Sequence, residues 1–174
     1  MSEPSQSALV VLVPQAEALV RSVREQHGLM FSQVPAHLTV LYPFKPPQEI
    51  TAGVIADLRR VFARFAPFPF ALSGLGTFPE ALYLIPMPGE PFVELTRAVY
   101  QQYPETPPYG GVFDEIVPHL TVGHTDKGPI ERIQQEVEVD LCSELPIHVV
   151  ASEVKLFDNS CGEWCERATF TLGA

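Results

Sequence analysis

Residues 34–42 read Val-Pro-Ala-His-Leu-Thr-Val-Leu-Tyr, and residues 117–123 repeat most of that order as Val-Pro-His-Leu-Thr-Val-Gly. Both stretches contain His-Leu-Thr-Val, at residues 37–40 and at residues 119–122. A proline precedes each copy, directly in the second and with one alanine between in the first. We call residues 37–40 the first tetrad and residues 119–122 the second tetrad.

Polar and apolar side chains alternate within each tetrad. In a β-strand, successive side chains point to opposite faces, so His37 and Thr39 are predicted to share one face while Leu and Val enter the core. The same pattern places His119 and Thr121 on one face of a second strand. Two such polar rows in a small chain predict a single site with two imidazoles and two hydroxyls.

Length and composition limit the kinds of protein this chain can be. Its 174 residues suffice for one domain or two small lobes with a real core. The apolar content of 46% is ordinary for a globular protein, and the 18 scattered prolines predict many turns. The net charge of −10 argues against binding long nucleic acid, because Lys and Arg contacts to phosphates supply most of that affinity.

Apolar periodicity outside the tetrads predicts alternating strands and helices. Short β-branched runs indicate strands, and apolar residues three and four apart indicate amphipathic helices. Gly, Pro and Asn clusters at 74–80, 104–111 and 158–163 predict turns or loops. The predicted strands are 8–13, 36–42, 68–73, 81–85, 118–123, 146–157 and 165–172, and the predicted helices are 15–27, 51–65, 90–103 and 129–139.

The predicted elements repeat in order after each tetrad. Both halves read tetrad strand, helix, strand, turn, strand, although the sequences differ outside the tetrads. Two similar halves can pack about a pseudo-two-fold axis. We therefore expect the two tetrad strands to face each other across a cleft.

Two His-x-Thr-x tetrads that begin at His37 and His119, with Pro43-Phe44 after the first, make the chain resemble the 2H phosphoesterase family. That family includes bacterial proteins of the 2'-5' RNA ligase type and the cyclic phosphodiesterases. The resemblance implies an α+β fold, with two pseudo-symmetric lobes of mostly antiparallel sheet and outer helices around a central cleft. Residues 1–174 are then expected to form one bilobal domain. Gly123-His124-Thr125 departs from the family pattern and predicts that the second tetrad strand ends early.

Two histidines suit phosphodiester cleavage, because an unperturbed pKa of about 6.5 lets each take or give a proton near neutral pH. We predict His37 and His119 as the catalytic acid and base, without assigning which is which. Thr39 and Thr121 are predicted to bind the non-bridging phosphate oxygens. No metal and no cofactor are predicted. The resemblance implies hydrolysis of a 2',3'-cyclic phosphate, or of a related 2'-linked phosphodiester, to leave a 2'-phosphate.

Two other functions stay open. One is the joining of RNA ends at the same site, as the ligase name suggests, and the other is non-catalytic binding of a nucleotide or phosphorylated ligand. The expected partner is a small nucleotide or an RNA terminus, with no long nucleic acid and no membrane, and the chain is expected to be a monomer. Residues 1–7 lack signal-peptide features, and no run reaches the roughly 20 apolar residues of a membrane span, so a cytoplasmic location is expected.

Other polar and aromatic residues have less specific interpretations. His124 is interpreted as a surface histidine, with a place at the flank of the site as the alternative. Lys45 is interpreted as a solvated lysine, with a charge offered to a phosphate as the alternative. Tyr109, in a Gly-rich loop before the second tetrad, is a candidate to stack on a base. The residues given structural roles are His27 at a helix end, His148 in a strand, and Tyr42 and Tyr83 in the core or a cleft wall.

The three cysteines predict neither a disulfide framework nor a metal site. Cys142, Cys161 and Cys165 are odd in number. Their spacing, even with His148, does not match the Cys-x2-Cys pairs of common zinc sites. The sequence also lacks a P-loop, a dinucleotide-binding glycine motif and a nucleophile-elbow motif.

Overall fold

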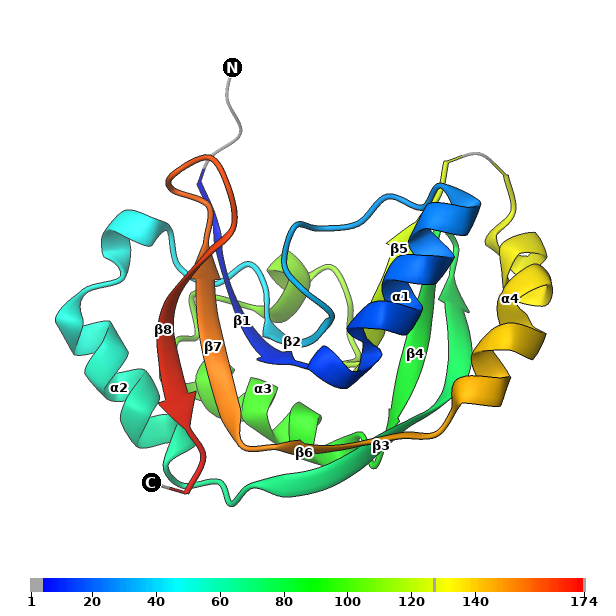
Figure 1. The fold of residues 1–174 in the computed structure, drawn as a ribbon. Helices are drawn as coiled ribbons and strands as arrows, with labels where there is room; N and C mark the ends of the chain where they lie inside the picture. Colours follow the sequence, from blue (N-terminus) through cyan, green and yellow to red (C-terminus); the bar gives the residue numbers. More distant parts are fainter. Residues whose placement is uncertain (1–4, 127, 174) are drawn as a thin grey trace.

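A curled eight-stranded sheet with helices packed against it forms the fold (Figure 1). The structure is a computed structural model that describes residues 5–126 and 128–173. Every strand pairing it describes is antiparallel, so the predicted α+β class with a mostly antiparallel sheet is confirmed. The strands are β1 (Ser7–Leu12), β2 (His37–Leu41), β3 (Phe68–Phe78), β4 (Ala81–Met87), β5 (Leu120–His124), β6 (Ile147–Ala151), β7 (Glu153–Asp158) and β8 (Cys165–Thr171). The helices are α1 (Pro14–His27), α2 (Ala52–Phe62), α3 (Glu90–Gln102) and α4 (Ile130–Glu144), with 3-10 turns η1 (Pro47–Glu49) and η2 (Pro108–Gly111).

The two tetrad strands are neighbours in this sheet. The strand order is β6-β3-β4-β5-β2-β1-β7-β8, and the paired residues Leu38 and Leu120 join β2 to β5. The sheet therefore consists of two four-stranded halves that meet along the tetrad strands. Our expectation that these strands face each other across a cleft is wrong, because the halves join edge to edge.

The predicted repeat of elements is present in the structure. After the first tetrad come α2, β3 and β4, and after the second come α4, β6 with β7, and β8. Helix α1 packs against β5, α3 against β2, α4 against β3 and α2 against β8. Figure 1 shows α2 beside β8 at one end of the molecule, and α1 and α4 at the other.

Local sequence signals set the helix limits. Pro14 occupies the first turn of α1, and Gly28 ends the helix in the left-handed conformation at φ 61°. The hydroxyl of Thr51 accepts a hydrogen bond from the Val54 amide at 3.3 Å and caps α2. Helix α4 continues past the predicted end at residue 139, because Leu141 extends its buried face.

Two strand predictions are corrected. Strand β3 continues to Phe78, through the segment whose glycines predict a turn. Gly76 lies under the ring of Tyr83, where an added Cβ would come within 2.4 Å of the ring, so this glycine permits close packing instead of a turn. The single strand predicted for 146–157 is divided at Ser152 into β6, which pairs with β3, and β7, which pairs with β1.

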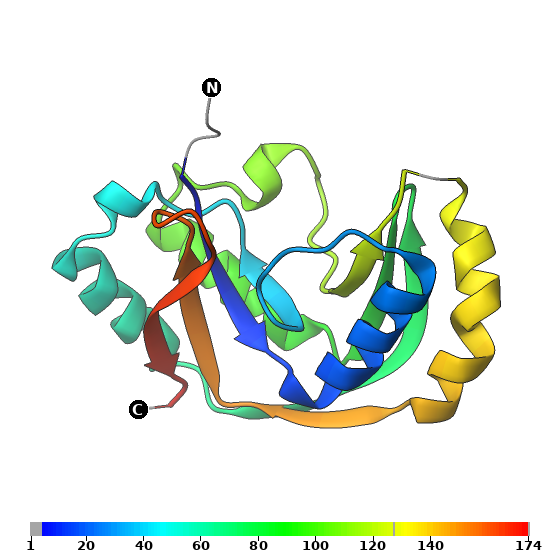
Figure 2. The same cartoon turned by 45° about the horizontal axis from the view of Figure 1, so that its top comes forward.

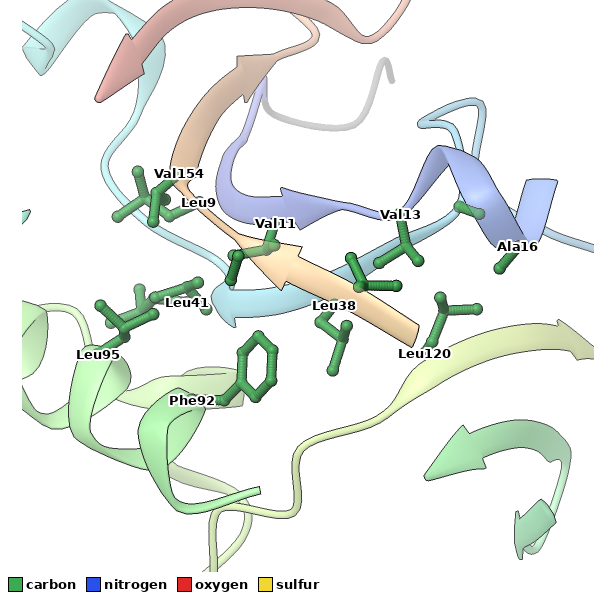
Figure 3. Close-up of a cluster of buried hydrophobic side chains, with 14 of the residues drawn as sticks. Leu9, Val11, Val13, Ala16, Leu38, Leu41, Phe92, Leu95, Leu120 and Val154 are labelled. Atoms are coloured by element: carbon green, nitrogen blue, oxygen red, sulfur yellow. The ribbon is translucent and has the colours of Figure 1, made fainter. Parts of the chain in front are cut away.

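The larger of two buried hydrophobic clusters among the described residues extends beneath both halves of the sheet. The fully buried Leu38 and Leu120 meet Val11 and Phe92 within it, as Figure 3 shows. The apolar residues of both tetrads thus anchor the strands from below, and their polar residues lie on the opposite face. Of the helices described, none is long and apolar enough to cross a membrane.

Candidate active site

The four predicted site residues lie on one face of two adjacent strands. His37 and Thr39 are half-buried on β2 while the neighbouring Leu and Val are buried, and β5 repeats this pattern. His119 immediately precedes β5, and Thr121 lies within it. Because Leu38 pairs with Leu120, the polar rows run side by side. Figure 2 shows the loops that lead into β2 and β5 on the same side of the sheet.

The imidazoles have matching hydrogen bonds. Nδ1 of His37 lies 2.7 Å from the carbonyl oxygen of Pro35, and Nδ1 of His119 lies 2.7 Å from the carbonyl oxygen of Val117. A carbonyl oxygen can only accept, so each Nδ1 carries the hydrogen and donates it. In a neutral ring Nε2 is then the basic nitrogen. The proline-containing segments before the tetrads thus set the same tautomer in both histidines.

Burial lowers the pKa of both histidines below the usual value of 6.5. For His37 the main cause is desolvation, and the positive charges of Arg24 and His119 lower its pKa further. For His119 desolvation again dominates, and His124 adds a smaller effect. Both rings are therefore mainly neutral near pH 7. The pairing of Leu38 with Leu120 places the two histidines at neighbouring strands.

Tyr109 connects the two tetrads. Its ring stacks on that of His119, with centroids 6.2 Å apart and planes 23° apart, and its phenol interacts with the side chain of Thr39. Its amide donates to the Tyr42 carbonyl at 2.7 Å, which ties this loop to the end of β2. Burial raises the pKa of Tyr109 to about 12, so the phenol stays neutral. One side chain thus interacts with the threonine of the first tetrad and the imidazole of the second.

A cleft of about 770 Å³ opens beside His119. One part of its lining is aromatic, and includes Tyr109 and the 67% exposed Phe113. Another part is acidic, and among the described residues no Lys or Arg lines the cleft. The lining residues are Phe78, Pro79, Glu80, Ala81, Tyr109, Phe113, Asp114, Glu115, Val117, His119 and His124.

Helix α1 holds both tetrads from behind through two charged residues. The carboxylate of Glu17 accepts a hydrogen bond from the Ala36 amide at 2.6 Å, just before the first tetrad, and this bond is the main reason that its pKa is lowered. The guanidinium of Arg24 donates to the carbonyls of Val122 at 2.6 Å and Thr121 at 3.3 Å. Arg24 is only 6% exposed, and this burial lowers its pKa by desolvation. These contacts fix how the tetrad strands sit relative to each other.

Sequence reasoning missed Arg24, although a signal was present. Arg24 follows Val20 by four residues, so it falls on the apolar face of α1, where a charge needs a partner. Its partners are carbonyls nearly a hundred positions away in the chain, and no local pattern identifies them. The ring of Phe31, 4.3 Å from the guanidinium carbon, adds a cation–π contact.

The other basic candidates have mixed outcomes. His124 is exposed as predicted, and it also lines the cleft beside His119. The interpretation of Lys45 as a solvated lysine is wrong. Its side chain is 11% exposed and pairs with Glu105, with its amino group 4.8 Å from the ring centre of Tyr103.

The residues that we interpreted as structural lie at helix ends, in strands or beside the site. His27 ends α1 and faces Glu136 of α4, with 3.5 Å between nitrogen and carboxylate oxygen. His148 is exposed on β6, at the edge of the sheet. The hydroxyl of Tyr42 donates to the Gln6 side chain, and the ring of Tyr83 lies 5.4 Å from that of His119.

The predicted early end of the second tetrad strand is also corrected. Strand β5 includes Gly123 and His124, and His124 forms a bridge with Met30. An added Cβ at Gly123 would come within 2.6 Å of Leu29 Cβ. The glycine that departs from the family pattern therefore lets this loop approach β5 and extend the pairing.

The sequence of this chain is similar to those of known proteins. Residues 12–162 match the model of the 2'-5' RNA ligase superfamily. A proposed phosphoesterase of Bacillus licheniformis is 24% identical over 178 residues, covering 95% of this chain and 98% of its own length. A proposed phosphoesterase of Geobacillus kaustophilus is also 24% identical, with 95% of both chains covered.

Two solved structures share this fold. TT0787 of Thermus thermophilus superposes with a TM-score of 0.67 at 19% identity, over 97% of this chain and 98% of its own. LigT of E. coli, crystallised with 3'-AMP, gives 0.63 at 15% identity, over 99% and 100%. The class defined by the paired tetrads is that of the 2H phosphoesterases. The chain belongs to the 2'-5' RNA ligase superfamily, and it is an enzyme of the phosphoesterase kind.

Proposed function

We propose that this protein is a metal-independent phosphodiesterase that opens a 2',3'-cyclic phosphate, or a related 2'-linked phosphodiester, by acid–base catalysis with two histidines. The observation that carries the proposal is the matched pair His37 and His119. Both rings direct their Nδ1 hydrogen to the backbone, both leave Nε2 for chemistry, and Tyr109 joins the two tetrads.

In this mechanism one Nε2 takes a proton from water while the water oxygen bonds to phosphorus. The other Nε2 gives a proton to the ribose oxygen as its bond to phosphorus breaks, which leaves a monoester. Burial lowers the pKa of both rings, so the two histidines share the roles of base and acid without an assignment of which is which. Such proton transfers typically contribute about 10²–10⁴-fold each to the rate.

The threonine hydroxyls serve the phosphate itself. Thr39 and Thr121 lie two positions after their histidines on the same strand face. In this proposal they donate to the non-bridging oxygens, where negative charge is held through the transition state. Fixed donors of this kind need no reorganisation during the reaction.

The cleft supports a small substrate with a single phosphate. Its aromatic wall, with Tyr109 and Phe113, suits stacking of a nucleobase. Its carboxylates, Glu80, Asp114 and Glu115, oppose any further phosphate placed there. The crystallised complex of LigT with 3'-AMP, a nucleoside monophosphate, is consistent with a ligand of this size.

The acidic lining also argues against the two rival functions. RNA ligation requires two RNA ends in one site, and the second end would bring phosphates close to these carboxylates. A binding module without catalysis has no need for two histidines with matching tautomers. Turnover is the observation that separates the three functions.

The test is incubation of the purified protein with 2',3'-cyclic AMP in the presence of EDTA. We expect ring opening to a monophosphate, and a loss of about 10²–10⁴-fold in kcat for His37→Ala and for His119→Ala. His148→Ala, which changes an exposed histidine at the sheet edge, is the matched control and keeps full activity. Absence of turnover in the wild type, or full activity in both tetrad variants, would contradict the proposal.

A further inference from the structure

The β7–β8 hairpin carries two thiols that nearly touch. Sγ of Cys161 lies 3.2 Å from Sγ of Cys165, and both side chains are exposed. The third cysteine, Cys142, is exposed on α4. We propose that Cys161 and Cys165 form a redox-active dithiol, which closes reversibly to a disulfide when a low-molecular-weight disulfide acts as oxidant.

The hairpin holds the two sulfur atoms in this arrangement. Asp158 pairs with Cys165 across the strands, and its carboxylate accepts hydrogen bonds from the amide and the hydroxyl of Ser160. Gly162, at φ 92°, donates its amide to the Asn159 carbonyl at 3.1 Å and turns the chain back. Closing the bond requires the sulfur atoms to approach by about 1 Å, which is within reach of an exposed turn.

The two thiols differ in a way that suits this reaction. The Cys161 thiol donates a hydrogen bond to the Glu163 carbonyl at 3.3 Å, and the combined effect of the Glu163 backbone and the Cys165 thiol is a lowered pKa of Cys161. The same pair interaction raises the pKa of Cys165. An exposed thiol that ionises more readily than its neighbour is the nucleophile of such a pair. In this proposal Cys161 is taken as the attacking thiol, and Cys165 as the resolving one.

The reaction proceeds by two exchanges. The Cys161 thiolate attacks one sulfur of the oxidant, forms a mixed disulfide and releases one small thiolate. The Cys165 thiolate then attacks the Cys161 sulfur, forms the intramolecular bond and releases the second. One protein dithiol and one small disulfide become one protein disulfide and two small thiols, and excess dithiol reagent reverses the sequence.

The neighbouring Trp164 gives this reaction an optical signal. It is the single tryptophan of the chain, and it directly precedes Cys165. Its ring meets that of Tyr42 edge-on, with centroids 6.3 Å apart, at the end of the first tetrad strand. Closure of the disulfide therefore changes the surroundings of the sole indole, and fluorescence reports it.

The test uses the full chain with glutathione disulfide, followed by titration of free thiols and intact-mass measurement. We expect Cys161 and Cys165 of the wild type to lose their thiols with a mass decrease of about 2 Da, and any glutathione adduct to be confined to the exposed Cys142. Trp164 fluorescence changes in parallel and recovers with dithiothreitol. Cys142→Ser loses both of its remaining thiols and ends about 2 Da lighter, with no glutathione attached.

The single variants of the pair distinguish this chemistry from simple thiol exposure. Cys165→Ser retains Cys161 and accumulates the glutathione adduct, because no resolving thiol remains. Cys161→Ser shows neither the mass decrease nor the fluorescence change. A Cys142→Ser variant that keeps both free thiols, or that ends as a stable glutathione adduct, would overturn the proposal.

Discussion

His37 donates its Nδ1 hydrogen to the carbonyl oxygen of Pro35 at 2.7 Å, and His119 makes the same bond to Val117. Each bond connects a histidine to the residue two positions before it, at the entry to its tetrad. Two sequence segments far apart in the chain therefore reach the same tautomer by the same local geometry. That shared tautomer leaves Nε2 of each ring as the basic nitrogen, which is what the proposed mechanism requires.

The tautomers can be measured by nitrogen NMR of histidine-labelled protein at pH 8, where both rings are neutral. We expect Nδ1 of His37 and His119 to give pyrrole-type signals and Nε2 to give pyridine-type signals. Variants with His→Gln at 37 and 119 assign the peaks. Pyridine-type Nδ1 signals would contradict the arrangement described above.

The lowered histidine pKa values predict the pH dependence of kcat/KM. In the free enzyme both rings titrate below 6.5, because burial disfavours their charged forms. The mechanism needs one ring protonated, and that form becomes scarce as pH rises. We therefore expect kcat/KM to be highest at mildly acidic pH and to fall steadily between about pH 6.5 and 8.5. A rise of kcat/KM up to about pH 8.5 would count against the lowered pKa values.

The lowered pKa values of His37 and His119 also predict that the protein becomes less stable at acidic pH, where kcat/KM is highest. In the unfolded chain these histidines become protonated near pH 6.5, whereas in the folded chain they become protonated only at lower pH. The part of the free energy of unfolding that depends on these histidines is therefore at its full value above about pH 6.5. It declines as the pH falls toward the folded pKa values. Urea titrations at pH 7.5 and 5.5 check this, and a smaller decline is expected for the His37→Ala and His119→Ala variants. An equal decline in both variants would assign the pH dependence to other groups.

The threonine hydroxyls are predicted to act on the transition state. Thr39→Val and Thr121→Val each remove one donor to the phosphate oxygens, and we expect kcat to fall about 10²-fold with little change in KM. Thr39→Ser and Thr121→Ser keep the hydroxyl and serve as controls with near wild-type kcat. Steady-state kinetics on 2',3'-cyclic AMP measures both constants. Equal activity of the valine and serine variants would remove the threonines from the mechanism.

The acidic cleft predicts discrimination between substrates. We expect 2',3'-cyclic AMP to have about tenfold higher kcat/KM than its 5'-phosphorylated form at low salt, because the second phosphate approaches Asp114 and Glu115. Asp114→Asn combined with Glu115→Gln reduces this ratio, and so does high salt. Glu138→Gln, an exposed change on α4 outside the cleft lining, leaves the ratio unchanged. If wild type hydrolyses both substrates equally, the cleft does not select by charge; if it hydrolyses neither, the proposed function fails.

The tetrads can be predicted from the sequence because the signal is local. Strict alternation of polar and apolar residues fixes which side chains enter the core once the strand forms, and the burial of Leu38 and Val40 beside the half-buried His37 and Thr39 confirms it. The order of helices and strands can be predicted for the same reason. The family resemblance then supplies the class of fold.

The relation between the tetrads cannot be predicted in this way. The pairing of Leu38 with Leu120, the carbonyl contacts of Arg24 and the stacking of Tyr109 on His119 all join residues distant in the sequence. No periodicity encodes such contacts. Gly76 shows the converse problem, because a glycine that signals a turn locally serves close packing in the folded chain.

The central claim is that His37 and His119 act as one unit on one phosphate, and a double-mutant cycle tests it most directly. The measurement is kcat for 2',3'-cyclic AMP, with EDTA present, for His37→Ala, His119→Ala and the double variant. We predict that the double variant loses about as much as the more impaired single variant, because either removal already disables the pair. Losses that multiply in the double variant would mean that the histidines act independently, and would contradict the account.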